Sequence, residues 1–400
     1  MWEQIRSNRI RSIILVIGMG ALLFALGYAI GLYFFDSAAG GIVIALIIWF
    51  IMSIVSYFQG DSILLSVSRA KKISREDYPR LYNVVEEMKI ASGLKKMPDI
   101  YIIDDPALNA FAAGRDPDHA SIAVTSGLLQ KLNRDELQGV IAHEMSHINN
   151  RDVLLMSIAG VLLGTIVILS WYASRIAFFS GGSRNRRSRS SDRGGGQIII
   201  LVIAIVLTIL APIFAQLIYF AVSRKREYLA DASAALYTRY PEGLASALEK
   251  IAHSETEVQS ANNATAPMYI ANPFRKKRSA NDLTSTHPPI EERIRILRSM
   301  AGASYVDYNQ AYKQVRQGRE VIPASAIAAS AQTVPSRAAQ SGKEGELDEK
   351  QQARETSDVL WRINDYHTVD CECGVRLRVP PGYPESRIRC PRCGRINSIE

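Results

Sequence analysis

The chain has 400 residues, 48% of them hydrophobic, and a formal net charge of +8 at pH 7. Its mean hydropathy is nevertheless close to zero, because long apolar blocks alternate with strongly charged ones. This alternation argues against a single soluble domain and is typical of a multi-pass membrane protein, whose basic surface would suit an anionic membrane.

Four charge-free segments are longer than the roughly 20 residues that span the hydrocarbon core of a bilayer. They cover residues 12–35, 37–60, 153–174 and 194–223. The core helices of globular proteins rarely need such lengths without a charge, so we expect four membrane segments. Arginines precede the first segment as they would in a signal peptide, but its apolar run is too long for one and the second follows at once.

The charges around the first two segments predict their orientation. Basic residues precede the first and follow the second, and only an aspartate lies between them: Arg6, Arg9, Arg11, Arg69, Lys71, Lys72, Arg75 and Asp36. Since flanks rich in Lys and Arg stay in the cytoplasm, we expect a protein of the inner (plasma) membrane with a cytoplasmic catalytic part. The arginines within residues 184–193 conflict with this rule if the third and fourth segments both cross. Either this hairpin dips in without crossing, or the rule fails there.

A small mixed unit is expected between the second segment and residue 133. Residues 75–92 have helical periodicity, whereas residues 100–103 and 121–125 are short and β-branched, as strands are. Between these two strands lies a run of small residues around one aromatic: Asn109, Ala110, Phe111, Ala112, Ala113 and Gly114.

The pattern H-E-x-x-H at His143, Glu144 and His147 is the most informative chemical feature. Its segment is expected to be a helix, because Asn133 and Glu136 match a capping box and an apolar stripe follows. Residues four apart share a helical face, so both imidazoles can bind one metal ion while Glu144 addresses a water bound to it. This arrangement is that of zinc hydrolases.

A catalytic zinc takes three protein ligands and leaves a fourth position for water, so one ligand must come from another segment. Glu227 and Asp231 are again four residues apart, within S-R-K-R-E-Y-L-A-D at residues 223–231. Glu227 is the candidate third ligand, and Asp231 would accept a hydrogen bond from the outer ring nitrogen of His143. The pattern E-x-x-x-D is common on solvated helices, and it gains this interpretation from the upstream histidines.

His287 precedes a helix expected over residues 290–300, whose early glutamates suit a helix N-terminus. The prolines that follow His287 restrict the backbone there. Two roles remain open for this histidine. It can donate a hydrogen bond to the oxyanion that forms when a peptide carbonyl is attacked, or it can be a structural cap.

The end of the chain is different in composition. Residues 322–358 are rich in Ala, Ser, Gln and charge without apolar periodicity, which predicts a linker. All the cysteines follow it as two close pairs: Cys371, Cys373, Cys390 and Cys393. This is typical of a zinc ribbon, although C-x-C replaces the usual C-x-x-C in the first pair. Disulfides are the alternative, but the expected cytoplasmic location argues against them. The nearby arginines are most simply a solvated basic face, so no nucleic acid partner is expected.

Several of these runs resemble HtpX-type membrane metalloproteases, relatives of the CAAX prenyl proteases. The similar runs are H-E-M-S-H-I-N-N-R-D at residues 143–152, residues 223–231, N-A-F-A-A-G at 109–114 and S-T-H-P at 285–288. They cover roughly the first three quarters of the chain. The resemblance implies a gluzincin fold, zinc on His143, His147 and Glu227, Glu144 as general base, and a role in membrane protein quality control. It also makes residues 109–114 an edge strand that pairs with an extended peptide; the alternative is an ordinary loop.

Together these inferences predict an α+β protein, mainly α, with several membrane passes, a gluzincin-type metalloprotease domain and a small β-rich zinc ribbon. The expected parts are two transmembrane helices at residues 1–60, the first part of the catalytic domain at 61–152, a hydrophobic hairpin at 153–223, the second catalytic part at 224–321, the linker at 322–358 and the zinc-ribbon-like module at 359–400.

The predicted function is a membrane-embedded zinc endopeptidase that cleaves misfolded or damaged membrane and membrane-proximal proteins at the cytoplasmic face. It would hold one catalytic and one structural Zn²⁺, and its partners would be the lipid bilayer and membrane protein or peptide substrates. His147 and Glu227 each lie within six residues of an apolar segment, so the metal is expected within about 10 Å of those segments. Two alternatives remain: a CAAX-type prenyl protease, and a catalytically silent scaffold that recruits partners through the ribbon.

Overall fold

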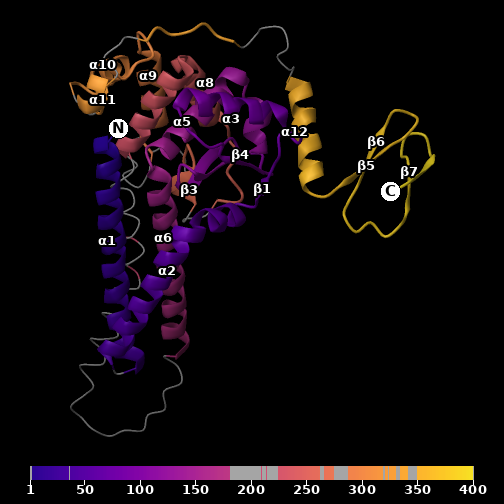
Figure 1. The fold of residues 1–400 in the computed structure, drawn as a ribbon. Coiled ribbons are helices and arrows are strands. Elements are labelled where there is room, and N and C mark those ends of the chain that lie inside the picture. The colour runs from indigo at the N-terminus through magenta and orange to yellow at the C-terminus, as the bar shows by residue number, and fades with distance from the viewer. Residues whose placement is uncertain are drawn as a thin grey trace.

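The fold consists of a helical column, a head that contains a β-sheet, and a small C-terminal module joined to the head by a helix (Figure 1). The structure is a computed structural model. It describes residues 2–399 apart from 36, 181–208, 210–212, 214–223, 262–264, 274–286, 319, 323, 330–333 and 341–348. The arginine-rich loop and nearly all of the fourth predicted membrane segment, residues 194–223, therefore lie outside the described residues.

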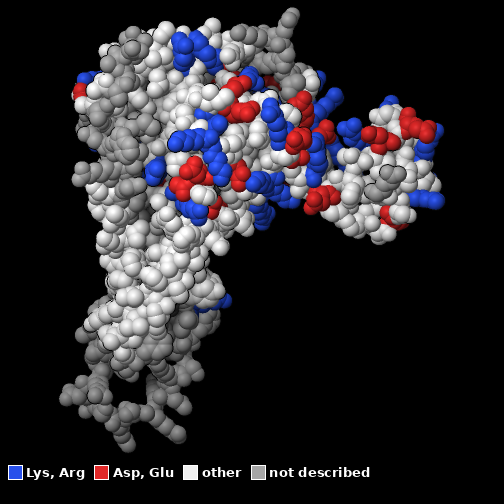
Figure 2. Space-filling view, in the orientation of Figure 1, with Lys and Arg blue, Asp and Glu red and all other residues white. Residues whose placement is uncertain are grey.

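Within the described residues the column is formed by α1 (Trp2–Phe35), α2 (Ala38–Val67) and α6 (Asp152–Ser180). Two helical stretches, Ala38–Val67 and Asp152–Tyr172, are long and apolar enough to cross a membrane, and α1 contains a shorter apolar stretch, Val16–Leu32. Only 11% of the most apolar window of α2 is buried, so α2 turns apolar side chains outward as a membrane span does. On the face seen in Figure 2, the charged side chains gather on the head and the C-terminal module and leave the column nearly free of them.

α1 and α2 pack so closely that backbone meets backbone. Gly27 and Gly31 of α1 face Gly41 of α2, where an added Cβ would lie 2.1 Å from the Gly27 carbonyl oxygen and 2.6 Å from the Gly31 Cα. Small residues permit this approach, and close packing of this kind is a main source of attraction between apolar helices in a bilayer.

Gly41→Ala is therefore expected to push α1 and α2 apart. Overpacking of this kind costs about 1–3 kcal/mol, which would lower the Tm of the purified protein in detergent. Gly40→Ala is the matched control, because a Cβ added there meets only the Ser37 side chain, at 3.4 Å. Equal effects of the two substitutions would contradict the close packing of the two helices.

A four-stranded sheet lies in the head, in the order β1 (Ala70–Lys72), β2 (Asp99–Ile103), β4 (His119–Thr125) and β3 (Ala110–Asp116). β2 and β4 are parallel, and the other neighbouring strands are antiparallel. Both strands predicted from β-branched residues are present. The run of small residues between them lies mostly in β3, which is an edge strand, so the strand expected from the family resemblance is confirmed and the loop alternative is wrong.

Helices surround this sheet and supply most of the core around it. α3 begins at Pro79 rather than at residue 75, because the Asp77 carboxylate accepts a hydrogen bond from the Ser74 N–H at 2.8 Å and forms a turn there. The helices of the head are α3 (Pro79–Ser92), α4 (Ser126–Lys131), α5 (Arg134–Asn149), residues 224–238, α8 (Pro241–His253), the 3-10 helix η1 (Ala266–Met268), α9 (Ile290–Arg298), α10 (Tyr305–Val315) and α11 (Ala324–Ala329).

The predicted linker is partly helical and is attached to the head. It contains α11 and most of α12 (Glu349–Ile363). Gln352 of α12 donates to the Leu132 carbonyl at 2.6 Å, and Arg337 donates to the Asp135 carboxylate at 2.7 Å. The description as a linker is therefore corrected. These hydrogen bonds are made by polar side chains, which apolar periodicity does not show, and Ile322 and Ala326 of the same stretch join the buried core of the head.

The C-terminal module contains two antiparallel ribbons. β5 (His367–Asp370) pairs with β6 (Arg376–Val379), and β7 (Arg387–Arg389) pairs with β8 (Ile396–Ser398). One close cysteine pair lies in the turn of each ribbon. This is the layout that a zinc ribbon requires, since each turn supplies two sulfurs to one ion.

Candidate metal centre

α5 carries the H-E-x-x-H pattern, and local contacts determine where it begins. Asn133 accepts a hydrogen bond from the Glu136 N–H at 2.9 Å, and the Glu136 carboxylate accepts one from the Asn133 N–H at 2.8 Å, which confirms the predicted capping box. α5 packs against α3, α8 and β3 and is buried along nearly its whole length. His143 and Glu144 are consequently shielded from bulk water, at 0% and 1% exposed.

The structure brings together the three residues predicted to bind the metal. The Nε2 atoms of His143 and His147 are 3.2 Å apart, and the Glu227 carboxylate oxygens lie 3.5 Å from His143 Nε2 and 3.6 Å from His147 Nε2. Nitrogen and oxygen ligands at about 2.0–2.1 Å from a tetrahedral zinc lie about 3.4 Å from one another. The three side chains therefore fit one zinc ion as they stand.

A carboxylate behind each imidazole orients its ring. Asp231 Oδ1 is 3.0 Å from His143 Nδ1, in the predicted place, and Asp152 Oδ2 is 3.2 Å from His147 Nδ1. These contacts leave the Nε2 atoms of both rings directed at Glu227. The role of Asp152 was not predicted, because it depends on the bend at Arg151, with φ 57°, between α5 and α6.

A buried arginine of α9 contacts the carboxylates of Asp231 and Glu227. Arg293 is 1% exposed and donates to both carboxylate oxygens of Asp231, at 2.7 and 2.8 Å. It also donates to the Ile270 carbonyl at 2.9 Å, and its Nη1 is 3.8 Å from Glu227 Oε2. Sequence reasoning missed Arg293, since one arginine among several charged residues of a helix carries no pattern.

These contacts set the charges of the site. Burial lowers the pKa of His143, but the hydrogen bonds to Asp231 and Glu227 outweigh it and raise that pKa to about 9. Burial raises the pKa of Glu227, yet the charge of His287 and the hydrogen bond with His143 bring it well below its usual range. The pKa of Asp231 is likewise lowered by Arg293 against the effect of burial. Both carboxylates are therefore anionic, and a binding metal ion must displace the proton of His143.

Glu144 differs from the other carboxylates because neither of its oxygens has a hydrogen-bond partner in the described part of the chain. Burial is the main cause that raises its pKa. The backbone of Ala112 has a smaller effect and lowers that pKa, which places the edge strand β3 beside Glu144. A buried carboxylate without partners is unfavourable, so its oxygens are available for water or substrate at the metal.

His287 lies against the predicted ligands. Its Nδ1 is 3.1 Å from Glu227 Oε2, and the residue is 6% exposed. α9 has Pro289 as its N-cap, without a side-chain cap hydrogen bond. The His287 ring therefore contacts the predicted ligand Glu227, and Pro289 occupies the N-cap position of α9.

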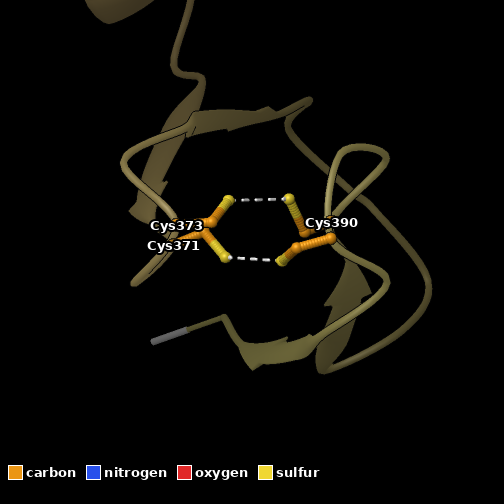
Figure 3. A group of neighbouring side chains, drawn as sticks. Cys371, Cys373 and Cys390 are labelled. Carbon is orange, nitrogen blue, oxygen red and sulfur yellow. Dashed lines mark hydrogen bonds between the residues drawn. The ribbon is translucent and has the colours of Figure 1, made fainter.

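The cysteines form a second cluster, in the C-terminal module. Cys371 Sγ is 3.5 Å from Cys393 Sγ, Cys373 Sγ is 3.6 Å from Cys390 Sγ, and no disulfide joins them. Figure 3 shows Cys371 and Cys373 facing Cys390 across the space between the two turns. Sulfurs at about 2.3 Å from a tetrahedral zinc lie about 3.8 Å apart, so the cluster fits zinc. Backbone hydrogen bonds from Cys393 and Arg392 lower the pKa of the Cys390 thiol to about 6, which favours the thiolate that binds metal.

Comparison with known proteins found a family model and several relatives that match this chain. Residues 75–301 match the model of peptidase family M48. A protease HtpX homolog of Dictyoglomus turgidum is 48% identical over 75% of this chain and 94% of its own length. A protease HtpX homolog of Streptococcus mutans is 44% identical over 75% of this chain and 100% of its own length. The crystal structure of Ste24p from S. mikatae aligns at 21% identity with a TM-score of 0.39, over 74% of this chain and 67% of that one.

Proposed function

The chain belongs to peptidase family M48, and we propose that it is a zinc-dependent endopeptidase that cleaves misfolded or damaged membrane and membrane-proximal proteins. The observation that carries the proposal is the meeting of His143, His147 and Glu227 beside Glu144, whose buried carboxylate has no hydrogen-bond partner among the described residues. A purely structural zinc site takes four protein ligands and has no use for such a carboxylate.

Each residue of the site has a distinct task in this proposal. Zinc held by His143, His147 and Glu227 would polarise the scissile carbonyl and lower the pKa of the attacking water to about 7. Glu144 accepts the proton of that water as general base and passes it to the leaving amine. Burial raises the pKa of Glu144, which strengthens it as a base. His287 donates a hydrogen bond to the oxyanion.

We propose that residues 109–114, which lie mostly in the edge strand β3, bind the backbone of the substrate. The register with β4 turns the backbone groups of Ala110, Ala112 and Gly114 outward. Two of the outward carbonyls are already bonded, that of Ala110 to the Ile270 N–H at 2.9 Å and that of Gly114 to the Ser157 hydroxyl at 3.3 Å. Ala112 lies between them, so its N–H and C=O are the groups with which an extended peptide would pair.

The position of the metal centre supports membrane substrates. Asp152, whose carboxylate contacts His147, is the first residue of α6, and the apolar stretch Asp152–Tyr172 begins with it. If the column spans the bilayer, a scissile bond at the metal lies close to the membrane surface. The basic residues that flank α1 and α2 support a cytoplasmic head at the inner (plasma) membrane. The quality-control role rests on the resemblance to HtpX proteases.

We also propose a structural zinc ion on Cys371, Cys373, Cys390 and Cys393. Its support is the spacing of the sulfurs, all within 4.8 Å of one another, and the absence of disulfides among them. The catalytic domain would then consist of residues 61–152 and 224–321, separated by the hairpin at 153–223, with the ribbon as an added module.

Proteolysis is expected to depend on removable zinc. Protein purified in lipid should cleave casein and a destabilised membrane protein, lose both activities to a chelator and regain them with zinc. Metal analysis should find about two zinc ions per chain, one for each cluster, and about one after Cys390→Ser. Cleavage by fully stripped protein would contradict the proposed function. Equal rates on soluble and membrane-embedded substrates would contradict only the preference for membrane proteins.

A further inference from the structure

Arg226 is a buried cation that neither the metal centre nor its packing explains. It is 5% exposed, its Nε and Nη1 have no hydrogen-bond partner in the described part of the chain, and its Nη2 contacts the Met156 sulfur at 3.0 Å. A guanidinium removed from water without an acceptor is unfavourable, and an apolar side chain of similar size would avoid that penalty. The N–H groups of Arg226 are therefore expected to be satisfied by a ligand.

Two connections link Arg226 to the metal centre, one through its own helix and one through α6. It directly precedes Glu227 in the helix at residues 224–238. Met156, which it contacts, follows Asp152 by about one turn of α6, so the two side chains share a face of that helix. Asp152 in turn holds His147. Arg226 thus contacts α6 about one turn from the residue that orients His147.

α6, which Arg226 contacts at Met156, also packs against the substrate strand β3. The next residue, Ser157, donates to the Gly114 carbonyl at 3.3 Å. Gly114 is two residues from Ala112 in β3, which corresponds to about 7 Å. A peptide paired at Ala112 would therefore bring a position about one to three residues from its scissile bond toward Arg226.

We propose that Arg226 binds a carboxylate of the substrate, from an acidic side chain or the chain terminus, and so selects for an acidic group close to the scissile bond. This inference rests on the proposed function, because it requires a peptide at the metal. A carboxylate supplies both the negative charge and the acceptors that Nε and Nη1 lack. Charge-assisted hydrogen bonds of this kind are strong, and more so where water is excluded.

The test uses the full protein in lipid and peptides that differ in one group. Glutamate is compared with glutamine at each position within about three residues of the cleaved bond, and a C-terminal acid with the amide. Wild type should prefer the acidic member of one pair by about 10- to 100-fold in kcat/KM. Arg226→Met should abolish this preference, Arg226→Lys should retain part of it, and Lys225→Met, which changes the exposed neighbour, should leave it intact.

The position of the preferred pair distinguishes the two sources of the carboxylate. Arg226→Met should leave the Tm unchanged or raise it, because it removes an unpartnered buried charge. A lower Tm with equal losses on acidic and neutral peptides would show a structural role and overturn the proposal. Activity that depends on Arg226 only in vesicles with an anionic phospholipid would assign the site to a lipid phosphate and overturn it as well. Wild-type protein that cleaves neither the peptides nor casein would contradict the proposed function itself. Cleavage without any preference for the acidic peptides would contradict only the role proposed for Arg226.

Discussion

Glu144→Gln is expected to lower kcat by about 10²–10⁴-fold or more, because the substitution removes the group that moves the proton from water to the leaving amine. Glutamine has nearly the same shape, and the Glu144 oxygens make no hydrogen bonds within the described protein that the amide would break. The Tm should therefore stay the same or rise. The zinc content should also be unchanged, since the predicted ligands are His143, His147 and Glu227. Cleavage of casein and of a destabilised membrane protein, with zinc analysis of the same samples, measures all three effects.

The matched control is Glu291→Gln, which changes an exposed glutamate of α9 in the same way and should retain full activity. This comparison also separates an enzyme from a silent scaffold. A scaffold would recruit the same partners with either residue at position 144 and would show no proteolysis in wild type. Undiminished cleavage by Glu144→Gln would show that another group acts as the base.

Arg293→Met is expected to weaken zinc binding and to destabilise the fold. The substitution leaves Asp231 buried at 0% exposed without its cationic partner, and breaking a buried ion pair on one side costs about 3–5 kcal/mol of unfolding free energy. Asp231 also orients His143, and the loss of such outer contacts typically lowers metal affinity by about 10–100-fold. Urea unfolding and competition with a zinc chelator measure the two effects separately.

Two further variants make this prediction specific. Arg298→Met, one turn further along α9, removes ion pairs to Glu242 and Glu249 that are about 40% exposed, and it should cost no more than about 1 kcal/mol. The double variant Arg293→Met with Asp231→Asn should recover part of the stability, because no unpaired charge remains. Its zinc affinity should stay low, since the carboxylate behind His143 is gone. Zinc affinity that is unchanged in Arg293→Met would refute a positioning role for this arginine.

The contacts of the site that could be predicted from the sequence are those whose geometry is local. The capping box at Asn133 and Glu136 involves residues three apart, and its contacts in the structure are the expected ones. His143 and His147 lie one helical turn apart, so their side chains point the same way wherever the helix packs. The same reasoning applies to Glu227 and Asp231. In each case the helical period determines that side chains four residues apart point in the same direction.

The parts that were missed depend on which segments pack together. Asp152 reaches His147, five residues away, because the chain bends at Arg151, whose φ is 57°, between α5 and α6. Arg293 reaches Asp231 because α9 and the helix at residues 224–238 lie side by side. Both residues look like ordinary surface charges in the sequence. The predicted linker was misjudged for the same reason, since Gln352 bonds to the head and Ile322 and Ala326 join its buried core.

The sequence was therefore sufficient to infer the helices of the column, the helix of the H-E-x-x-H pattern and the candidate ligands. These inferences used helical periodicity, caps and the lengths of apolar runs, which depend mainly on residues within one or two turns of each other. The contact of Arg293 with Asp231, the outward face of Ala112 in β3 and the burial of Arg226 arise from contacts between distant segments. Such contacts depend on how whole helices and strands pack, and no short pattern of residue types encodes that packing.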